Sequence, residues 1–186
     1  VAQAMLAADV ILTPTSGALY HTEAARAAIA AGARLLTLSE CTEEVLVRGG
    51  VFADFAALAP HSYRLAALLT AATTARVTAP GGTDFTVRLD ERVAVPNPGM
   101  VRKPGDRSGC PTIEAFIAPL ETSAEGTVVV DASASSVGVL SEPIRLTLQG
   151  GRAAAIEGGS AAATIRTLLD HAGTPNAYIL AEVAFG

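Results

Sequence analysis

The spacing of apolar residues changes partway along this chain. In the first part, short runs of Val, Ile and Leu alternate with alanine-rich segments whose apolar positions repeat every three to four residues. This pattern predicts strands at residues 10–12 and 33–39, with a helix over residues 23–32 between them. Thr22 is the expected N-cap and Gly32 the expected C-terminal glycine. Strand, helix and strand in this order predict a βαβ unit with parallel strands.

Two more helices are expected before the pattern changes. One begins after Thr42 and stops at Gly49 and Gly50. The other is a long helical stretch over residues 52–72, which we expect to break or bend at Pro60 because proline removes a backbone donor.

Beyond about residue 74 the apolar positions alternate with polar ones, as in a half-buried strand. Residues 111–118 and 126–131 are predicted strands, and residues 143–159 a β-hairpin that turns at Gln149-Gly150-Gly151. A helix over residues 160–173 and a strand over residues 177–185 complete the pattern.

These elements predict an α/β fold. A partial Rossmann-like parallel layer is expected over residues 1–75, followed by a mixed β-rich α+β domain over residues 76–186. The chain begins at Val1 rather than Met, and its last strand runs to Gly186 without a turn or a polar tail. We interpret the sequence as a fragment whose second domain is truncated at its C-terminus.

Composition excludes several classes of partner. The 186 residues carry a net charge of -5, so no basic face for nucleic acid is expected. No apolar run approaches the roughly 18 residues of a membrane helix, so no membrane partner is expected. Cys41 and Cys110 form neither a CxxC pair nor a disulfide framework, which favours reduced thiols and a cytoplasmic location.

Two glutamates stand in otherwise apolar strands. Glu114 is followed by Ala115 and Phe116, and Glu182 lies between Ala181 and Val183. A carboxylate buried without a partner is costly, so each needs a cation, a donor or a metal ion. Two such carboxylates from separate strands would suit a divalent metal. The alternative is an ordinary strand-end glutamate, capped by arginine or turned to solvent, and the residues alone leave both open.

Other candidate sites are weaker. The "APGGTD" segment lacks the spacing of a phosphate-binding loop and is more typical of a hairpin turn. The "TPTSGALYHT" loop follows a parallel strand, where α/β sheets place ligand loops, and its His21 is a candidate substrate contact or a helix-entry histidine. Ser16 has no G-x-S-x-G surroundings, so a serine hydrolase is not expected.

A series of spaced motifs resembles a known family. The motifs are "TSGALYHTEAARAAIAAGARLLTLSECTEEVL", "RVTAPGGTDFTVRL", "EAFIAPLETSAEGTVVVD", "EPIRLTLQGGRAAAIEGG" and "AEVAFG". Together they resemble the thermophilic aminopeptidase family, the metal-dependent leucyl aminopeptidases that include aminopeptidases T and S. The same organisation is shared by 2,5-dihydroxypyridine 5,6-dioxygenases, which are mononuclear non-haem iron enzymes.

The resemblance implies metal-binding roles for both glutamates. Pro111 and Glu114 match the aminopeptidase Pro-x-Gly-Glu strand start, although Ile113 replaces the usual glycine. Glu182 matches the second metal-binding glutamate, in a Gly-Glu-Val-Ala-like strand, with Ala181 in place of glycine. In the dioxygenases this second position resembles an iron-binding histidine, so Glu182 favours the hydrolase branch. The remaining metal ligands and the catalytic residues are expected beyond Gly186.

The resulting prediction is a metal-dependent aminopeptidase-like hydrolase of short peptides, in which the fragment itself is inactive. Its cofactors would be divalent ions (Zn, Co, Mg or Mn), with Glu114 and Glu182 as ligands about 5–8 Å apart. The alternatives are a ring-cleaving dioxygenase that uses Fe and acts on a small-molecule substrate, and a non-catalytic oligomerising domain. A homo-oligomer is expected, and no residue is assigned as general base.

Overall fold

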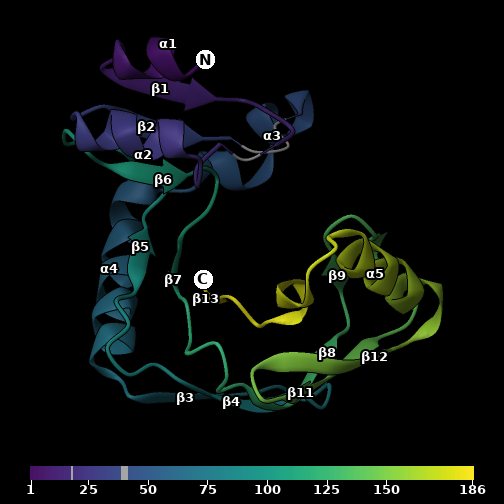
Figure 1. Ribbon diagram of the computed structural model, residues 1–186. Helices are drawn as coiled ribbons and strands as arrows, with labels where there is room; N and C mark the ends of the chain where they lie inside the picture. The colour runs from purple at the N-terminus through teal and green to yellow at the C-terminus, as the bar shows by residue number, and fades with distance from the viewer. Residues whose placement is uncertain (18, 39–41) are drawn as a thin grey trace. The chain divides into compact units, whose positions relative to one another are not determined.

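The computed structural model describes residues 1–17, 19–38 and 42–186, which form two compact units (Figure 1). Neither unit is one continuous segment. The first contains Val1–Ala67, Val95–Phe116 and Ala184–Gly186, and the second contains Leu68–Ala94 and Ile117–Val183. The predicted division into domains at about residue 75 stays a prediction for the whole protein. Cys41 lies outside the described residues.

A three-stranded parallel sheet forms the centre of the first unit. Its strands follow the order β1 (Val10–Thr13), β2 (Arg34–Thr37) and β6 (Arg107–Gly109), with β2 in the middle. Helix α2 (Glu23–Ala30) connects β1 to β2, so the predicted βαβ unit is confirmed (Figure 1). The third strand comes from far along the chain, and Leu35 is paired with Arg107.

Helix α2 forms where its cap and its small residues predict. The Thr22 hydroxyl accepts a hydrogen bond from the Ala25 amide at 3.2 Å, which satisfies one of the free donors at the start of the helix. Ala25 and Ala28 are fully buried in a core with Ile11 and Leu35. Their small side chains let the helix pack closely against the sheet, and larger residues would hold it away.

The remaining helices of this part follow their predicted order. After α1 (Ala2–Leu6), which opens the chain, they are α3 (Glu43–Val47), the 3₁₀ turn η1 (Gly49–Phe52) and α4 (Phe55–Ala71). Pro60 lies inside α4 and the helix continues through it, so the predicted break does not occur, while a bend there stays a prediction. Proline forfeits one hydrogen bond there, but its fixed φ is compatible with a helix. Asp54 also stabilises the first turn by accepting from the Ala57 amide at 3.0 Å.

A second three-stranded sheet has the order β13 (Val183–Phe185), β7 (Glu114–Ile117) and β5 (Val95–Asn97). The predicted strand over residues 177–185 is shorter than expected. Its beginning is instead taken up by the 3₁₀ turn η2 (Pro175–Tyr178), which starts where Thr174 accepts from the Asn176 amide at 3.3 Å. Proline at the first helical position favours this turn over an extended strand.

The second unit is built on a five-stranded antiparallel sheet. Its strand order is β12 (Arg152–Glu157), β11 (Ile144–Gln149), β8 (Glu125–Val130), β4 (Asp84–Arg88) and β3 (Thr74–Thr78). The predicted hairpin is confirmed as β11 and β12, and helix α5 (Gly159–His171) packs on it around a buried core (Figure 1). A short pair, β9 (Ser133–Ala134) and β10 (Gly138–Val139), follows β8.

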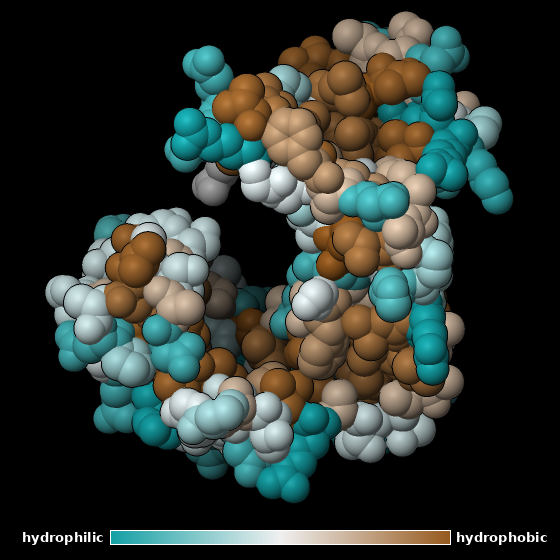
Figure 2. Space-filling model, turned by 180° about the vertical axis from the view of Figure 1, so that it is seen from behind, coloured by the Kyte–Doolittle hydropathy of each residue, from teal (hydrophilic) through white to brown (hydrophobic). Residues whose placement is uncertain are grey.

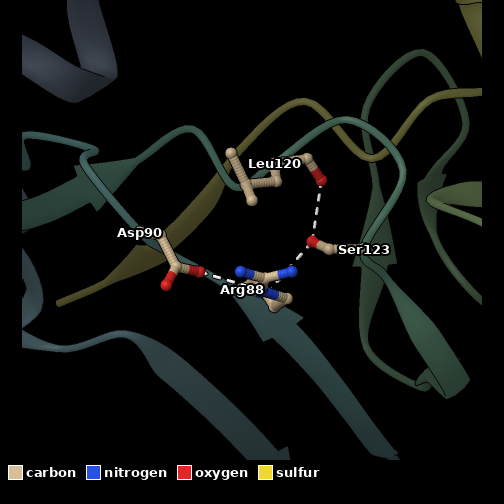
Figure 3. Close-up of polar contacts among 4 residues, drawn as sticks. All are labelled: Arg88, Asp90, Leu120 and Ser123. Carbon is tan, nitrogen blue, oxygen red and sulfur yellow. Dashed lines mark hydrogen bonds and ion pairs between the residues drawn. The ribbon is translucent and has the colours of Figure 1, made fainter.

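One serine joins a loop of the second unit to its sheet. The Ser123 hydroxyl donates to the Leu120 carbonyl at 2.7 Å and accepts from the Arg88 amide at 3.0 Å (Figure 3). The Arg88 guanidinium meets Asp90 at 2.9 Å (Figure 3). These contacts hold the segment before β8 against the end of β4, so this polar cluster is structural.

The parallel sheet of the first unit and the antiparallel, β-rich second unit confirm the predicted α/β fold class. Among the described residues, no helix has both the length and the apolar character needed to cross a membrane.

Candidate functional site

Glu114 is the first residue of β7 and is half-buried. The next residue, Ala115, is fully buried on the opposite face of the strand, and Ile117 is almost fully buried on that same face. In the antiparallel register of β5 and β7, Glu114 is directly opposite Asn97. Paired residues of this kind point to the same side of the sheet, so the carboxylate and the amide are neighbours.

Asn97 binds Glu114 through one hydrogen bond. Its Nδ2 donates to Glu114 Oε1 at 3.0 Å, while its Oδ1 accepts from the Ser108 hydroxyl at 2.6 Å and from the Gly109 amide at 2.8 Å. Asn97 is only 6% exposed and Ser108 is fully buried. No sequence motif marks Asn97 or Ser108, because "VAVPNPGM" is typical of a turn and only the pairing of β5 with β7 brings Asn97 to the carboxylate.

The backbone packs closely around this network. The Gly99 amide donates to Ser108 Oγ at 2.8 Å, and a Cβ at Gly99 would lie 2.3 Å from the Phe55 ring. A Cβ at Gly186 would lie 2.5 Å from the Ile113 carbonyl oxygen and 3.1 Å from Glu114 Cβ. Larger residues at either glycine would displace the segments that surround Glu114.

Glu182 is exposed and immediately precedes β13. It belongs to the second unit, whereas Glu114 belongs to the first. The shared site and its predicted side-chain separation of about 5–8 Å therefore stay predictions.

Within residues 1–17, 19–38 and 42–186, no three His, Cys, Asp or Glu side chains gather as a metal site would require. The three histidines lie in different places: His21 in the loop before α2, His61 in α4 and His171 at the end of α5. Glu114 fits the role of one carboxylate ligand, and any complete site needs further ligands.

The carboxyl end of β6 is part of this network, and the carboxyl ends of β1 and β2 are in register with it. Thr13 of β1 is paired with Thr37 of β2, which is paired in turn with Gly109 of β6. The buried Thr13 and Thr37 hydroxyls have no hydrogen-bond partner in the part of the chain that the structure describes. Open α/β sheets place ligands at this edge, and the Gly109 amide already donates to Asn97 there.

The weaker candidates have ordinary surroundings. His21 is exposed, and its ring meets the Tyr20 ring edge-on at 4.8 Å. Tyr20 also lies under the Arg107 guanidinium, with 4.8 Å from its carbon to the ring centre. The "APGGTD" segment is the turn between β3 and β4, closed by the Ala79 amide donating to the Thr83 carbonyl at 3.0 Å. The interpretation as a hairpin turn is confirmed.

A family model described as NicX, 2,5-dihydroxypyridine 5,6-dioxygenase, matches residues 1–186. The chain belongs to this family. No curated protein matches it. The match spans both units and every motif that carried the resemblance, so the organisation shared by dioxygenases and aminopeptidases is confirmed.

Two solved structures are similar to this member of the NicX family. A 2,5-dihydroxypyridine dioxygenase from Pseudomonas putida KT2440 has 26% sequence identity and a TM-score of 0.83, over 100% of this chain and 52% of that chain. AmpT from Thermus thermophilus has 21% identity and a TM-score of 0.66, over 99% of this chain and 57% of that chain. The likeness to AmpT shows the fold alone. The chain spans about half the length of both structures.

The expectation of an aminopeptidase-like hydrolase is wrong. The NicX family match and the dioxygenase structure both favour the dioxygenase alternative. The preference for the hydrolase branch over the dioxygenase branch rested on a single position, Glu182. Carboxylates and imidazoles both bind divalent metals, so the identity of one ligand does not decide the class of reaction. What the relatives have in common is that they are enzymes.

Proposed function

We propose that the whole protein is a non-haem iron dioxygenase that opens a hydroxylated pyridine ring of the 2,5-dihydroxypyridine type. The observation that carries this proposal is the match of residues 1–186 to the NicX family. The similar dioxygenase structure supports it over the full length of this chain. Because the chain spans 52% of that structure, the activity is proposed for the whole protein and not for these residues alone.

We propose that Glu114 and Glu182 are metal ligands of this enzyme. Ionised carboxylates bind iron as well as other divalent ions, and Glu114 is already held in place by the Asn97 amide. Glu182 stands where the resemblance places a histidine in the dioxygenases, so it would bring a negatively charged oxygen in place of a neutral nitrogen. Further ligands would come from outside these 186 residues. When bound, iron supplies the redox chemistry by which dioxygen reacts with the ring.

Assays of the full-length protein test the proposed activity. With Fe²⁺ supplied, we expect loss of the ultraviolet absorbance of 2,5-dihydroxypyridine together with uptake of one O₂ for each ring opened. With leucyl-p-nitroanilide and Co²⁺ or Zn²⁺, we expect no release of p-nitroaniline. Glu114→Gln and Glu182→Gln should each lower kcat at least about 100-fold, since removal of a metal ligand costs at least as much as removal of its supporting partner.

Glu157→Gln is the matched control, because Glu157 is exposed on β12 and makes no ion pair within the described residues. It should retain the wild-type rate. Release of p-nitroaniline without consumption of the pyridine would contradict the proposal. If neither compound reacts, the non-catalytic oligomerising domain becomes the better interpretation.

A further inference from the structure

The amide of Asn97 has only one orientation that satisfies its neighbours. Its Oδ1 faces two donors, the Ser108 hydroxyl and the Gly109 amide, and its Nδ2 faces the Glu114 carboxylate. If the amide were rotated by half a turn, its N–H groups would face the Gly109 donor and its oxygen would face the carboxylate oxygen. Both arrangements would be repulsive in a site where Asn97 is 6% exposed.

Ser108 and the Gly109 amide together set the direction of this network. The Ser108 Oγ accepts from the Gly99 amide at 2.8 Å and donates its single proton to Asn97 Oδ1 at 2.6 Å, in preference to the Gly109 carbonyl at 3.4 Å, because the shorter contact is the stronger one. The hydrogen bonds therefore run from Gly99 to Ser108, from Ser108 to Asn97 and from Asn97 to Glu114. Ser108 is fully buried, so water does not compete for these bonds.

The network engages one oxygen of the carboxylate. In the part of the chain that the structure describes, the hydrogen bond assigned to Glu114 is the one from Asn97 to Oε1. Oε2 is the oxygen left to bind another group. An amide donor on one carboxylate oxygen fixes the plane of the group and so the direction in which the second oxygen points.

We propose that Asn97 is a positioning residue, which Ser108 holds in one orientation so that Glu114 presents Oε2 to the metal ion. The proposal rests on the proposed function, because it takes Glu114 as a ligand. It adds two residues, Asn97 and Ser108, that act on the metal through Glu114 without touching it.

The test compares Co²⁺ binding by variants of the full-length protein. Affinity is measured by competition with a chelating indicator, and the visible absorption of the Co²⁺ complex reports its coordination. Asn97→Asp has nearly the same shape but places an acceptor against Glu114, so we expect at least about tenfold weaker binding and an altered spectrum. Asn176→Asp makes the same chemical change at the exposed η2 turn and should leave the Co²⁺ affinity and the visible spectrum unchanged.

Glu114→Gln separates this inference from the proposed function. If Glu114→Gln weakens Co²⁺ binding but Asn97→Asp does not, Glu114 remains a ligand and the positioning role is overturned. If Glu114→Gln binds Co²⁺ as the wild type does, Glu114 is not a ligand, and both proposals for this residue are overturned.

A second variant decides the question if Asn97→Asp does not fold, as judged by circular dichroism. Ser108→Ala leaves Asn97 and Glu114 in place but removes the proton that Asn97 Oδ1 accepts. Several-fold weaker Co²⁺ binding by Ser108→Ala is the expected result. Wild-type affinity in this variant would overturn the proposal.

Discussion

Asp84 on β4 is held by two hydrogen bonds from the Arg76 guanidinium on β3, at 2.8 Å to Oδ1 and 2.7 Å to Oδ2. Hydrogen bonding from Arg76 lowers the pKa of Asp84 below its ordinary value, and the positive charge of Arg76 acts in the same direction. Both side chains are exposed, so solvent and salt screen the pair and its contribution to stability is small.

The effect of Asp84→Asn on stability should depend on pH. Because the pKa of Asp84 is lower in the folded state than in the unfolded state, the pair stabilises the fold above about pH 4. That stabilisation is lost as the pH falls through the folded-state pKa. We expect Asp84→Asn to unfold at lower urea concentration than the wild type at neutral pH, with the difference shrinking as the pH falls below about 4.

Asp9→Asn provides the control for this measurement. Asp9 is exposed, and its side chain makes no ion pair with the residues that the structure describes, so its substitution should not produce this pH-dependent difference. A difference between Asp84→Asn and the wild type that stays constant from neutral to acidic pH would argue against the ion pair.

At the scale of elements, the turn between β11 and β12 uses two glycines for different reasons. Gly150 has φ +55° and open space around the position of a Cβ. Gly151 has φ +80°, and a Cβ there would lie 1.8 Å from the Glu121 carbonyl oxygen. The Gly151 amide donates to the Ala124 carbonyl at 3.0 Å, so the turn is held against the segment before β8.

Alanine substitutions should distinguish these two positions. Gly150→Ala should cost about 1–2 kcal/mol, the penalty of a left-handed backbone for a residue with a Cβ. Gly151→Ala adds a clash with backbone that cannot rotate away, so we expect a loss of more than about 3 kcal/mol. Urea unfolding of both variants under the same conditions measures the difference. Equal losses would show that the turn is not packed against Glu121.

At the scale of the whole molecule, large apolar side chains reach the surface of the first unit. Val10 and Leu12 on β1 are 46% and 60% exposed, and Figure 2 shows hydrophobic residues at the surface of this α1–β1 region. Contiguous apolar surface of this kind is typical of regions that become covered by other protein surface.

A homo-oligomer therefore stays our prediction for the full-length protein. Light scattering combined with size-exclusion chromatography should give a mass of at least twice that of one chain at micromolar concentration. The association should weaken on dilution and persist in high salt, because apolar contacts are not screened. A monomer mass across this range of concentrations would show the prediction to be wrong.

Local patterns were sufficient for many of the elements. Thr22 and Thr42 cap α2 and α3, as the spacing of polar and apolar residues predicts. The βαβ unit and the β11–β12 hairpin likewise follow from signals a few residues apart. Such signals act within one or two turns of chain, so they can be recognised in the sequence without knowing what the segment packs against.

The order of residues was enough to predict the α/β class, the caps, the hairpin and the unusual position of Glu114 in an apolar strand. The pairing of β6 with β2 and of Asn97 with Glu114 became visible only in the folded chain. Pairing between distant strands depends on which burial and backbone hydrogen bonds become available after the chain folds, and no local period encodes it. For the same reason, the partners of Glu114 emerged from strand register and not from any motif.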